Sequence, residues 1–254
     1  MSDYRPPEPV SILGIAVHPL DSGDLARAIA IWSQEGRARR VYNVNVHAMN
    51  IARSNADFRN ALLRADLVYC DGAGVQLAAN ILGKSIPVRL SVMDWIDESL
   101  DALEETRSRV YFVGDQPEVL ERAVTSIRRR HPRLEIAGFH HGFFEKESSE
   151  SIAVAKGIRE AQPSVVFVGM GMPTQELWIE ALLHQLPSSV YVPVGAAFRW
   201  YSGVQKRPPT WLRENSLEWL GRFAQEPIRL GGRYLVGNPR FLGRVLLERV
   251  RRAS

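Results

Sequence analysis

The sequence is poor in cysteine and has no long apolar run. Cys70 is the only cysteine among 254 residues, so an internal disulfide is excluded. The strongest apolar segment, residues 165–172, is interrupted by glycine and is far shorter than the roughly 18 to 20 residues of a membrane-spanning helix. The opening segment, MSDYRPPEPV, lacks the apolar stretch of a secretion signal. These absences predict a cytoplasmic protein that does not span a membrane.

The familiar nucleotide-binding fingerprints are also missing. There is no Gly-x-Gly-x-x-Gly sequence and no Walker loop, which disfavours NAD(P)-dependent oxidoreductases and P-loop NTPases. Hydrophobic residues make up 45% of the chain and charged residues 24%, which excludes global disorder and provides for a buried core. These absences do not exclude a nucleotide that binds through another geometry.

Short apolar runs alternate with segments of helical period along most of the chain. This pattern is typical of an α/β protein, here a Rossmann-like, mostly parallel sheet flanked by helices. In residues 118–130, Leu120, Val124 and Ile127 fall on one stripe, which is expected to pack on the sheet. We expect strands at residues 11–16, 40–45, 67–70, 109–113, 134–139, 164–169 and 189–194. We expect helices at residues 25–33, 56–64, 74–82, 94–105, 118–130, 149–161 and 175–184.

Basic residues are concentrated in the last fifth of the chain. The net charge is +4, but residues 207–254 contain ten arginines, no lysine and four glutamates, a balance of +6. The period there is helical, so we expect an α/β domain over residues 1–203 and a helical, basic appendage over residues 204–254. An element lying on an anionic membrane surface fits this appendage. The alternatives are an acidic protein partner, a nucleic-acid contact, for which no binding motif is present, and a solvated basic face.

Four glycine-bearing turns follow expected strands, at residues 71–74, 114–117, 169–173 and 195–198. The carboxyl edge of a parallel sheet is where ligands bind, and backbone N–H groups at helix N-termini suit phosphates. A single glycine turn is often only a steric requirement. Four on one sheet favour a phosphorylated ligand.

Asp71 follows an apolar strand and precedes small residues, which places its carboxylate at the rim of the sheet. A carboxylate there can act as a general base. It can equally cap the helix expected near Gly74. The residues alone leave both interpretations open.

A resident metal ion is not expected. His140 and His141 are adjacent, and neighbouring residues on a strand point to opposite faces, so their imidazoles should not share one ion. No Asp-x-Asp, His-x-x-x-His or cysteine partner accompanies them. His47 is interpreted as a polar residue near a helix start, and Cys70 as a small buried residue.

Residues 200–211 join the two expected parts of the chain. They contain aromatic side chains and the cations Lys206 and Arg207. The segment is either an ordinary linker with packing aromatics or a stretch whose cations face a phosphate in the cleft.

Many short motifs occur in one characteristic order between about residue 11 and about residue 241. They are Asn43-Val-Asn45, the segment 65–74, Arg89 with Asp94, Val113-Gly-Asp115, His141-Gly-Phe143, the segment 168–176, Gly195-Ala-Ala-Phe198, Lys206-Arg-Pro208, and the segments 218–227 and 233–239. With this series the chain resembles the WecG/TagA/CpsF family of bacterial glycosyltransferases. The whole series is far more specific than any one motif.

The resemblance implies an inverting transfer of a sugar from a UDP-sugar to a polyprenyl-diphosphate-linked saccharide, at the inner face of the cytoplasmic membrane. Exopolysaccharide, capsule and cell-wall polymer pathways use such enzymes. UDP-glucose is the first expectation for the donor; UDP-N-acetylmannosamine and its uronic acid are the alternatives. The UDP-sugar is a substrate, and no cofactor or metal is implied. The family's C-terminal appendage is linked to membrane association and to basic residues of the active site.

The resemblance also implies roles for individual residues. Asp71 occupies the place of the proposed general base, Gln175 that of a donor-holding glutamine, and Asn45 that of an asparagine in the cleft. Glycine-turn N–H groups and arginines would stabilise the departing diphosphate. The remaining expected donor- or substrate-binding residues are Asn43, Gly72, Gly74, Arg89, Asp94, Gly114, Phe143, Gly169, Gly171, Gly195, Arg199 and Arg207.

The chain departs from the family pattern at three of these positions. Members commonly have Thr where Asn43 stands, Tyr where Phe143 stands and Asp where Arg199 stands. A cation cannot accept the hydrogen bond that an aspartate accepts, so donor recognition is expected to differ here. The rival classes are a non-catalytic module that binds nucleotide or nucleic acid and a nucleotide-dependent oxidoreductase. The favoured interpretation includes no nucleic-acid partner and is compatible with a homo-oligomer.

Overall fold

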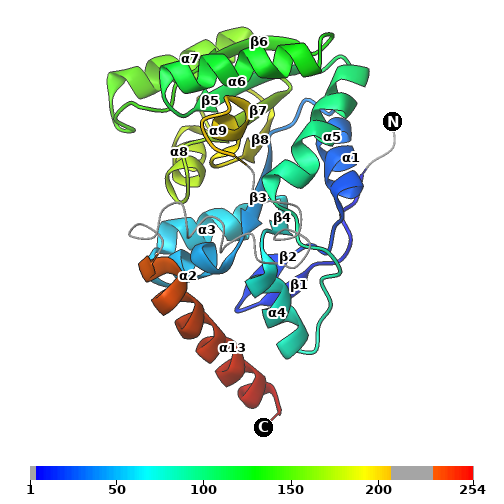
Figure 1. Ribbon diagram of the computed structural model, residues 1–254, viewed down its shortest axis with the longest axis vertical. Coiled ribbons are helices and arrows are strands. Elements are labelled where there is room, and N and C mark those ends of the chain that lie inside the picture. The colour runs from blue at the N-terminus through cyan, green and yellow to red at the C-terminus, as the bar shows by residue number, and fades with distance from the viewer. Residues whose placement is uncertain (1–3, 207–230, 254) are drawn as a thin grey trace.

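Six parallel strands form the centre of the molecule (Figure 1). The structure, a computed structural model, describes residues 4–206 and 231–253. The strand order is β4-β3-β8-β7-β5-β6, and every pairing in this sheet is parallel. The strands are β3 (Arg39–Val44), β4 (Leu67–Cys70), β5 (Arg109–Gly114), β6 (Glu135–His140), β7 (Val165–Gly169) and β8 (Val190–Pro193). The expected α/β class is confirmed.

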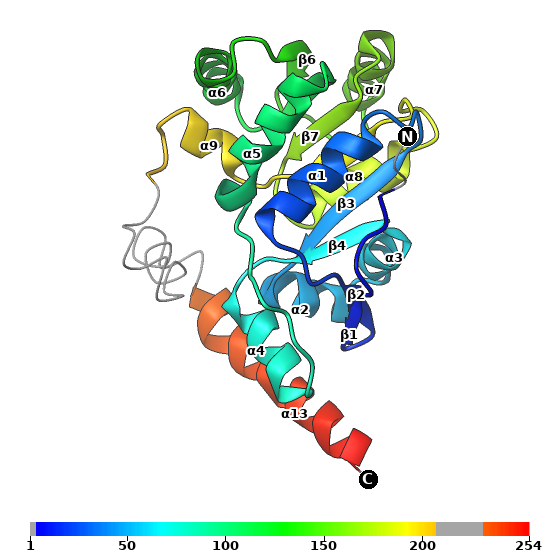
Figure 2. The same cartoon turned by 90° about the vertical axis from the view of Figure 1, so that its right-hand side faces the viewer.

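Helices cover both faces of this sheet (Figures 1 and 2). Alternate strand residues face opposite sides, so Phe112 and Phe167 join one core while Tyr111 and Val113 join the other. The first core is covered by α1 (Ser22–Trp32), α5 (Val92–Glu105), α6 (Pro117–Arg130) and α9 (Ala197–Tyr201). The second is covered by α2 (Val46–Ser54), α3 (Ala56–Arg64), α4 (Ala73–Ile81), α7 (Ser149–Ala161) and α8 (Thr174–Leu182).

Segments with a clear period fold as expected. In α6 the stripe of Leu120, Val124 and Ile127 is buried, whereas Arg128 and Arg129 are exposed. The apolar run of β4 coincides with the expected residues 67–70, and α3 and α7 also match their expected ranges. Burial of a continuous apolar stripe or run therefore determines these elements.

The expectation of one strand over residues 11–16 is wrong. The chain forms an antiparallel hairpin of β1 (Val10–Ile12) and β2 (Ile15–Val17) instead. Leu13 and Gly14 both adopt positive φ, 49° and 78°, and this left-handed pair reverses the chain. Apolar residues on both arms concealed the turn. Helices α2 and α9 also lie outside the expected helical ranges.

From Gly232 onward, the described part of the appendage is helical, as expected. It consists of the π-helix η1 (Gly232–Val236) and α13 (Gly237–Ala253). Phe241 and Val245 are fully buried, and α13 packs against α2 and α4 (Figure 1). Within the described ranges, no helix is both long and apolar enough to cross a bilayer. Arg207 and the motif segment 218–227 lie outside the described residues.

Candidate active site

A cavity of about 330 Å³ opens at the carboxyl ends of β3, β4, β7 and β8. The chain crosses from one half of the sheet to the other after β4, so the neighbours β3 and β8 belong to different halves. Ligands of open α/β sheets bind at such a point. Six of the expected site residues line the cavity: Asn43, Asn45, Asp71, Gly171, Gln175 and Gly195.

Two asparagines hold the carboxylate of Asp71. Nδ2 of Asn43 donates to Oδ2 of Asp71 at 3.1 Å, and Nδ2 of Asn45 donates to the same oxygen at 3.0 Å. Asn45 is itself fixed, because its Oδ1 accepts from the N–H of Ala48 at 3.1 Å and caps α2. Among the described residues, Oδ1 of Asp71 receives no such bond. The carboxylate is therefore oriented through one oxygen.

Asp71 does not cap a helix. The N-cap of α4 is Gly72, with φ 101° and ψ 148°, and no side chain donates or accepts at this cap. Of the two interpretations left open by the sequence, the cap is absent from the structure. Gly72 has a positive φ that a residue with a side chain adopts only with strain, and this turn directs Asp71 toward Asn43 and Asn45.

Gln175 connects two of the glycine turns. Its Oε1 accepts from the N–H of Gly171 at 3.1 Å and from the N–H of Gly195 at 3.2 Å. Its Nε2 donates to Oε1 of Glu176 at 2.8 Å. These two glycine N–H groups, which the sequence interpretation directed at a diphosphate, are thus engaged within the protein. Gln175 shapes the cavity wall by holding both turns.

Glu176 is a buried carboxyl group that sequence reasoning missed. It is fully buried, and its Oε2 has no hydrogen-bond partner among the described residues. Burial raises its pKa from 4.5 to about 7, although the bond from Gln175 opposes this shift. In the sequence it resembles an ordinary acidic residue in the first turn of a helix, so only the tertiary structure reveals it.

Three expected glycines serve close packing. A side chain at Gly114 would strike the backbone of Gly169, and one at Gly169 would strike the ring of Phe198. A side chain at Gly74 would meet Val46 of α2. The steric interpretation of glycine turns therefore accounts for these positions. Gly171 and Gly195, by contrast, have positive φ and open space beside them in the cavity wall.

The segment before α5 lies beside the end of β4. The N–H of Leu90 donates to the carbonyl of Cys70 at 2.8 Å. Arg89 precedes Leu90 and Asp71 follows Cys70, so this bond brings Arg89 near Asp71 in space. The carboxylate of Asp94 accepts from the N–H of Ser91 at 2.9 Å and completes a capping box on α5. Asp94 thus has a structural function at the edge of the site. His47, interpreted from sequence only as a polar residue near a helix start, lies in the first turn of α2 and lines the cavity.

Arg199 pairs with an acidic residue from the neighbouring turn. Its Nε lies 3.6 Å from Oδ2 of Asp115, which follows β5. The carbonyl of Asp115 accepts from the N–H of Gly142 at 2.8 Å, so the turn after β5 is joined to the loop that carries Phe143. The Phe143 side chain is exposed and does not line the Asp71 cavity.

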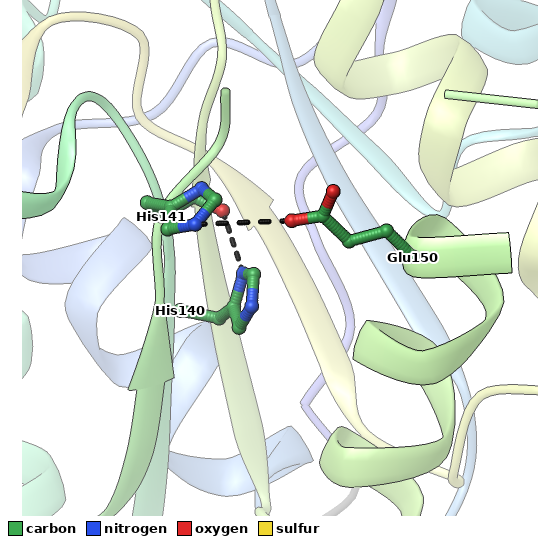
Figure 3. A group of neighbouring side chains, drawn as sticks. All are labelled: His140, His141 and Glu150. Carbon is green, nitrogen blue, oxygen red and sulfur yellow. Dashed lines mark hydrogen bonds and ion pairs between the residues drawn. The ribbon is translucent and has the colours of Figure 1, made fainter. Parts of the chain in front are cut away.

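The expectation for His140 and His141 is wrong in its geometry. Their ring centroids lie only 4.4 Å apart (Figure 3). His140 is the last residue of β6 and His141 lies beyond it, so the alternation of a strand no longer separates the two side chains. Glu150 of α7 completes the group.

These features define an α/β protein whose carboxylate-bearing cavity opens at the carboxyl edge of a parallel sheet. A profile described as "Glycosyl transferase WecG/TagA/CpsF family" matches residues 10–254, so the chain belongs to this glycosyltransferase family. The resemblance noted from the motifs is confirmed.

Three relatives carry the same name, "N-acetylglucosaminyldiphosphoundecaprenol N-acetyl-beta-D-mannosaminyltransferase". The protein of Bacillus spizizenii is 31% identical over 195 residues, which cover 77% of this chain and 74% of the relative. The protein of Staphylococcus aureus is 29% identical over 191 residues, which cover 75% of this chain and 74% of the relative. The protein of Bacillus subtilis is 29% identical over 189 residues, which cover 74% of this chain and 72% of the relative.

Proposed function

We propose that this chain transfers N-acetylmannosamine from UDP-N-acetylmannosamine to a polyprenyl-diphosphate-linked N-acetylglucosamine. Membership of the glycosyltransferase family supports the reaction type. The names of the relatives support this donor sugar and acceptor over UDP-glucose, which the sequence interpretation placed first. The polymer served is then a cell-wall polymer.

The observation that carries the proposal is the carboxylate of Asp71, held in the cavity by Asn43 and Asn45. Asp71 takes the proton of the acceptor hydroxyl while the hydroxyl oxygen attacks the anomeric carbon of the donor. The bond from that carbon to the diphosphate oxygen breaks, and UDP leaves with the electron pair. Attack opposite the leaving group inverts the anomeric configuration. By holding Oδ2, the two asparagines orient the carboxylate so that Oδ1 can take the proton in this step.

Negative charge develops on the departing diphosphate. Arg89, near the end of β4, and the cations Lys206 and Arg207 are the proposed counter-charges, together with backbone N–H groups of the turns that Gln175 does not engage. In this mechanism no metal ion takes part in the chemical step. The Arg199–Asp115 pair lies at the next turn of the sheet edge and is a proposed determinant of donor recognition.

The outer face of α13 is the proposed contact with an anionic membrane surface. Phe241 and Val245 face the protein, whereas Leu246, Leu247 and Val250 are more than half exposed, at 53%, 61% and 63%. The flanking cations Arg249, Arg251 and Arg252 are exposed as well. Apolar side chains among arginines suit a helix that lies in the headgroup region.

The same helix borders a basic groove on the protein. The groove has a volume of about 650 Å³ and lies between α13, α2, α3 and the hairpin turn. Arg53, Arg59, Arg244 and Arg251 line it, with Glu248 as the acidic residue of the lining. This excess of positive charge supports binding of anionic lipid at the same face.

A donor panel tests the proposed reaction. Purified protein is incubated with an undecaprenyl-diphosphate-linked N-acetylglucosamine and with UDP-N-acetylmannosamine, its uronic acid, UDP-N-acetylglucosamine or UDP-glucose, and the lipid product is identified by mass spectrometry. We expect a disaccharide product with UDP-N-acetylmannosamine at a rate at least tenfold above the others. Binding of a UDP-sugar without product from any donor would favour the non-catalytic class.

A further inference from the structure

Three side chains with metal-ligating atoms meet at the free edge of the sheet (Figure 3). One ligand atom from each of His140, His141 and Glu150 can be chosen so that all lie within 4.8 Å of one another. None of the three residues lines the cavity of Asp71. We propose that this group, named here the His-His-Glu cluster, binds a divalent transition-metal cation of the Zn²⁺ class.

The cluster is held by two regular elements. His140 ends β6, the edge strand, and His141 follows it directly. Glu150 stands in the first turn of α7, whose N-cap Ser148 accepts from the N–H of Ser151 at 3.3 Å. The Phe144 ring lies 5.8 Å from the His140 ring and 6.4 Å from the His141 ring, centroid to centroid. The donors thus come from a strand end and a helix start that pack together.

The distances between the side chains of the cluster suit a shared cation better than direct hydrogen bonds between these side chains. Nε2 of His141 lies 3.8 Å from Oε1 of Glu150, which is too long for a hydrogen bond. Two ligands that each lie about 2 Å from one zinc ion are roughly 3 to 4 Å apart. The ligand atom of His140 lies within 4.8 Å of the other two, so binding requires its ring to move closer to them. A water molecule would complete a four-coordinate site.

The ring nitrogens of the two histidines differ in their partners. Nδ1 of His141 is buried and has no hydrogen-bond partner among the described residues, while the opposite nitrogen faces Glu150 (Figure 3). Nδ1 of His140 lies 2.8 Å from the carbonyl oxygen of His141, so this backbone oxygen also lies next to the His-His-Glu cluster. Two protonated imidazoles at this separation would repel each other. Two neutral ones are ligands.

The local charge attracts a cation. Residues 145–150 contain three glutamates and one lysine. The lysine, Lys146, donates to the carbonyls of Gly142 and Phe144 at 2.7 and 2.6 Å, and its Nζ lies 3.9 Å from the centre of the Phe144 ring.

Two imidazoles and a carboxylate favour Zn²⁺, Co²⁺ or Ni²⁺ over Mg²⁺ and Ca²⁺, which prefer oxygen ligands.

A cation in the cluster would fasten the β6–α7 loop at both ends. The loop carries the exposed Phe143, and its Gly142 is bonded to the turn after β5. Binding is thus expected to order this loop against α7. The inference uses only the cluster and its surroundings, and it does not depend on the proposed transfer reaction.

The test uses tag-free, full-length protein stripped with chelator. Zn²⁺ binding is measured by calorimetry, and Co²⁺ binding by its visible absorption, with Mg²⁺ as the hard-cation control. We expect one equivalent of Zn²⁺ and Co²⁺ bands of a nitrogen and oxygen site without thiolate charge transfer. Glu150→Gln, at an exposed position, and His141→Ala should each weaken binding at least about tenfold.

Matched variants keep the inference open to contradiction. Glu147→Gln lies in the same loop, and His184→Ala changes a histidine just beyond the end of α8 that is not part of the cluster; both variants should bind like the unchanged protein. Failure to bind Zn²⁺ at micromolar concentration would overturn the inference. Equal loss in His141→Ala and His184→Ala, or none in the folded Glu150→Gln protein, would do so as well. Added Zn²⁺ should raise the Tm of the unchanged protein and of Glu147→Gln, but not that of Glu150→Gln.

Discussion

The amide nitrogen of Asn45 lies 3.0 Å from Oδ2 of Asp71, while the amide oxygen of the same side chain caps α2. One asparagine therefore fixes both the start of a helix and the carboxylate at the neighbouring strand end. Helix packing and the orientation of the proposed base are coupled at this residue.

Asn45→Ala should lower both stability and turnover. Loss of the cap costs about 1 kcal/mol of unfolding free energy. Loss of the bond to Asp71 frees the carboxylate, and we expect kcat to fall about tenfold or more, which corresponds to roughly 1.4 kcal/mol of barrier. Urea unfolding and steady-state transfer assays measure the two effects.

Asn55→Ala is the matched control. Asn55 caps α3 through the N–H of Phe58 at 2.9 Å and does not line the cavity. Its stability loss should be similar, with kcat unchanged. Asn45→Ser, which keeps a capping oxygen but is too short for Asp71, should restore stability and not turnover. Equal kcat losses at positions 45 and 55 would show that the effect is only structural.

Glu176→Gln should change the pH dependence of stability. The folded protein keeps the proton of Glu176 up to a pH of about 7, whereas the unfolded chain releases it near 4.5. The unfolded state binds fewer protons between these values, so the unfolding free energy falls as pH rises through this window. Relative to the unchanged protein, the variant should gain about 3 kcal/mol between pH 4.5 and 8.

Urea titrations at pH 4.5 and pH 8 measure that gain. Glu160→Gln, at an exposed position of α7, should show no pH-dependent difference. A constant difference between Glu176→Gln and the unchanged protein at both pH values would contradict the assignment of a raised pKa to Glu176.

Glutamates on the outer face of α13 should weaken vesicle binding. Leu246 and Val250 are exposed, so Leu246→Glu with Val250→Glu should leave the fold intact. Loss of apolar burial and added negative charge should weaken partitioning at least tenfold on vesicles containing about 30% phosphatidylglycerol. Co-sedimentation measures this.

The control for α13 changes an exposed apolar residue elsewhere. Ile152→Glu on α7 should bind vesicles like the unchanged protein, and vesicles of phosphatidylcholine alone should bind neither. Undiminished binding by the α13 double variant would remove this helix from the membrane contact.

Local pattern predicted most of the fold and the position of Asp71. In β4 and α6 the buried residues form a continuous apolar run and a regular apolar stripe, so the sequence pattern itself shows where each element lies. Asn43 lies in the neighbouring strand β3 and Asn45 directly follows that strand, and a spacing of two residues already favours both side chains pointing to one face. The hairpin at Leu13 and Gly14 was missed because its turn interrupts apolar residues that look continuous.

The remaining site features depend on contacts between distant segments. Gln175 reaches Gly195 across 20 residues, and the buried state of Glu176 follows from how α8 packs on the sheet. The meeting of His141 with Glu150 needs the path of the loop between β6 and α7. No periodicity encodes these distances.

Asp71→Asn tests the central claim most directly, with transfer from UDP-N-acetylmannosamine to the lipid-linked acceptor followed beside calorimetric binding of the donor. The amide keeps the shape of the side chain but cannot take the acceptor proton. We expect donor affinity within about threefold of the unchanged protein and a rate of transfer lower by 10²-fold or more, roughly the contribution of a general base. Transfer at an unchanged rate would contradict the assignment of Asp71 as the base.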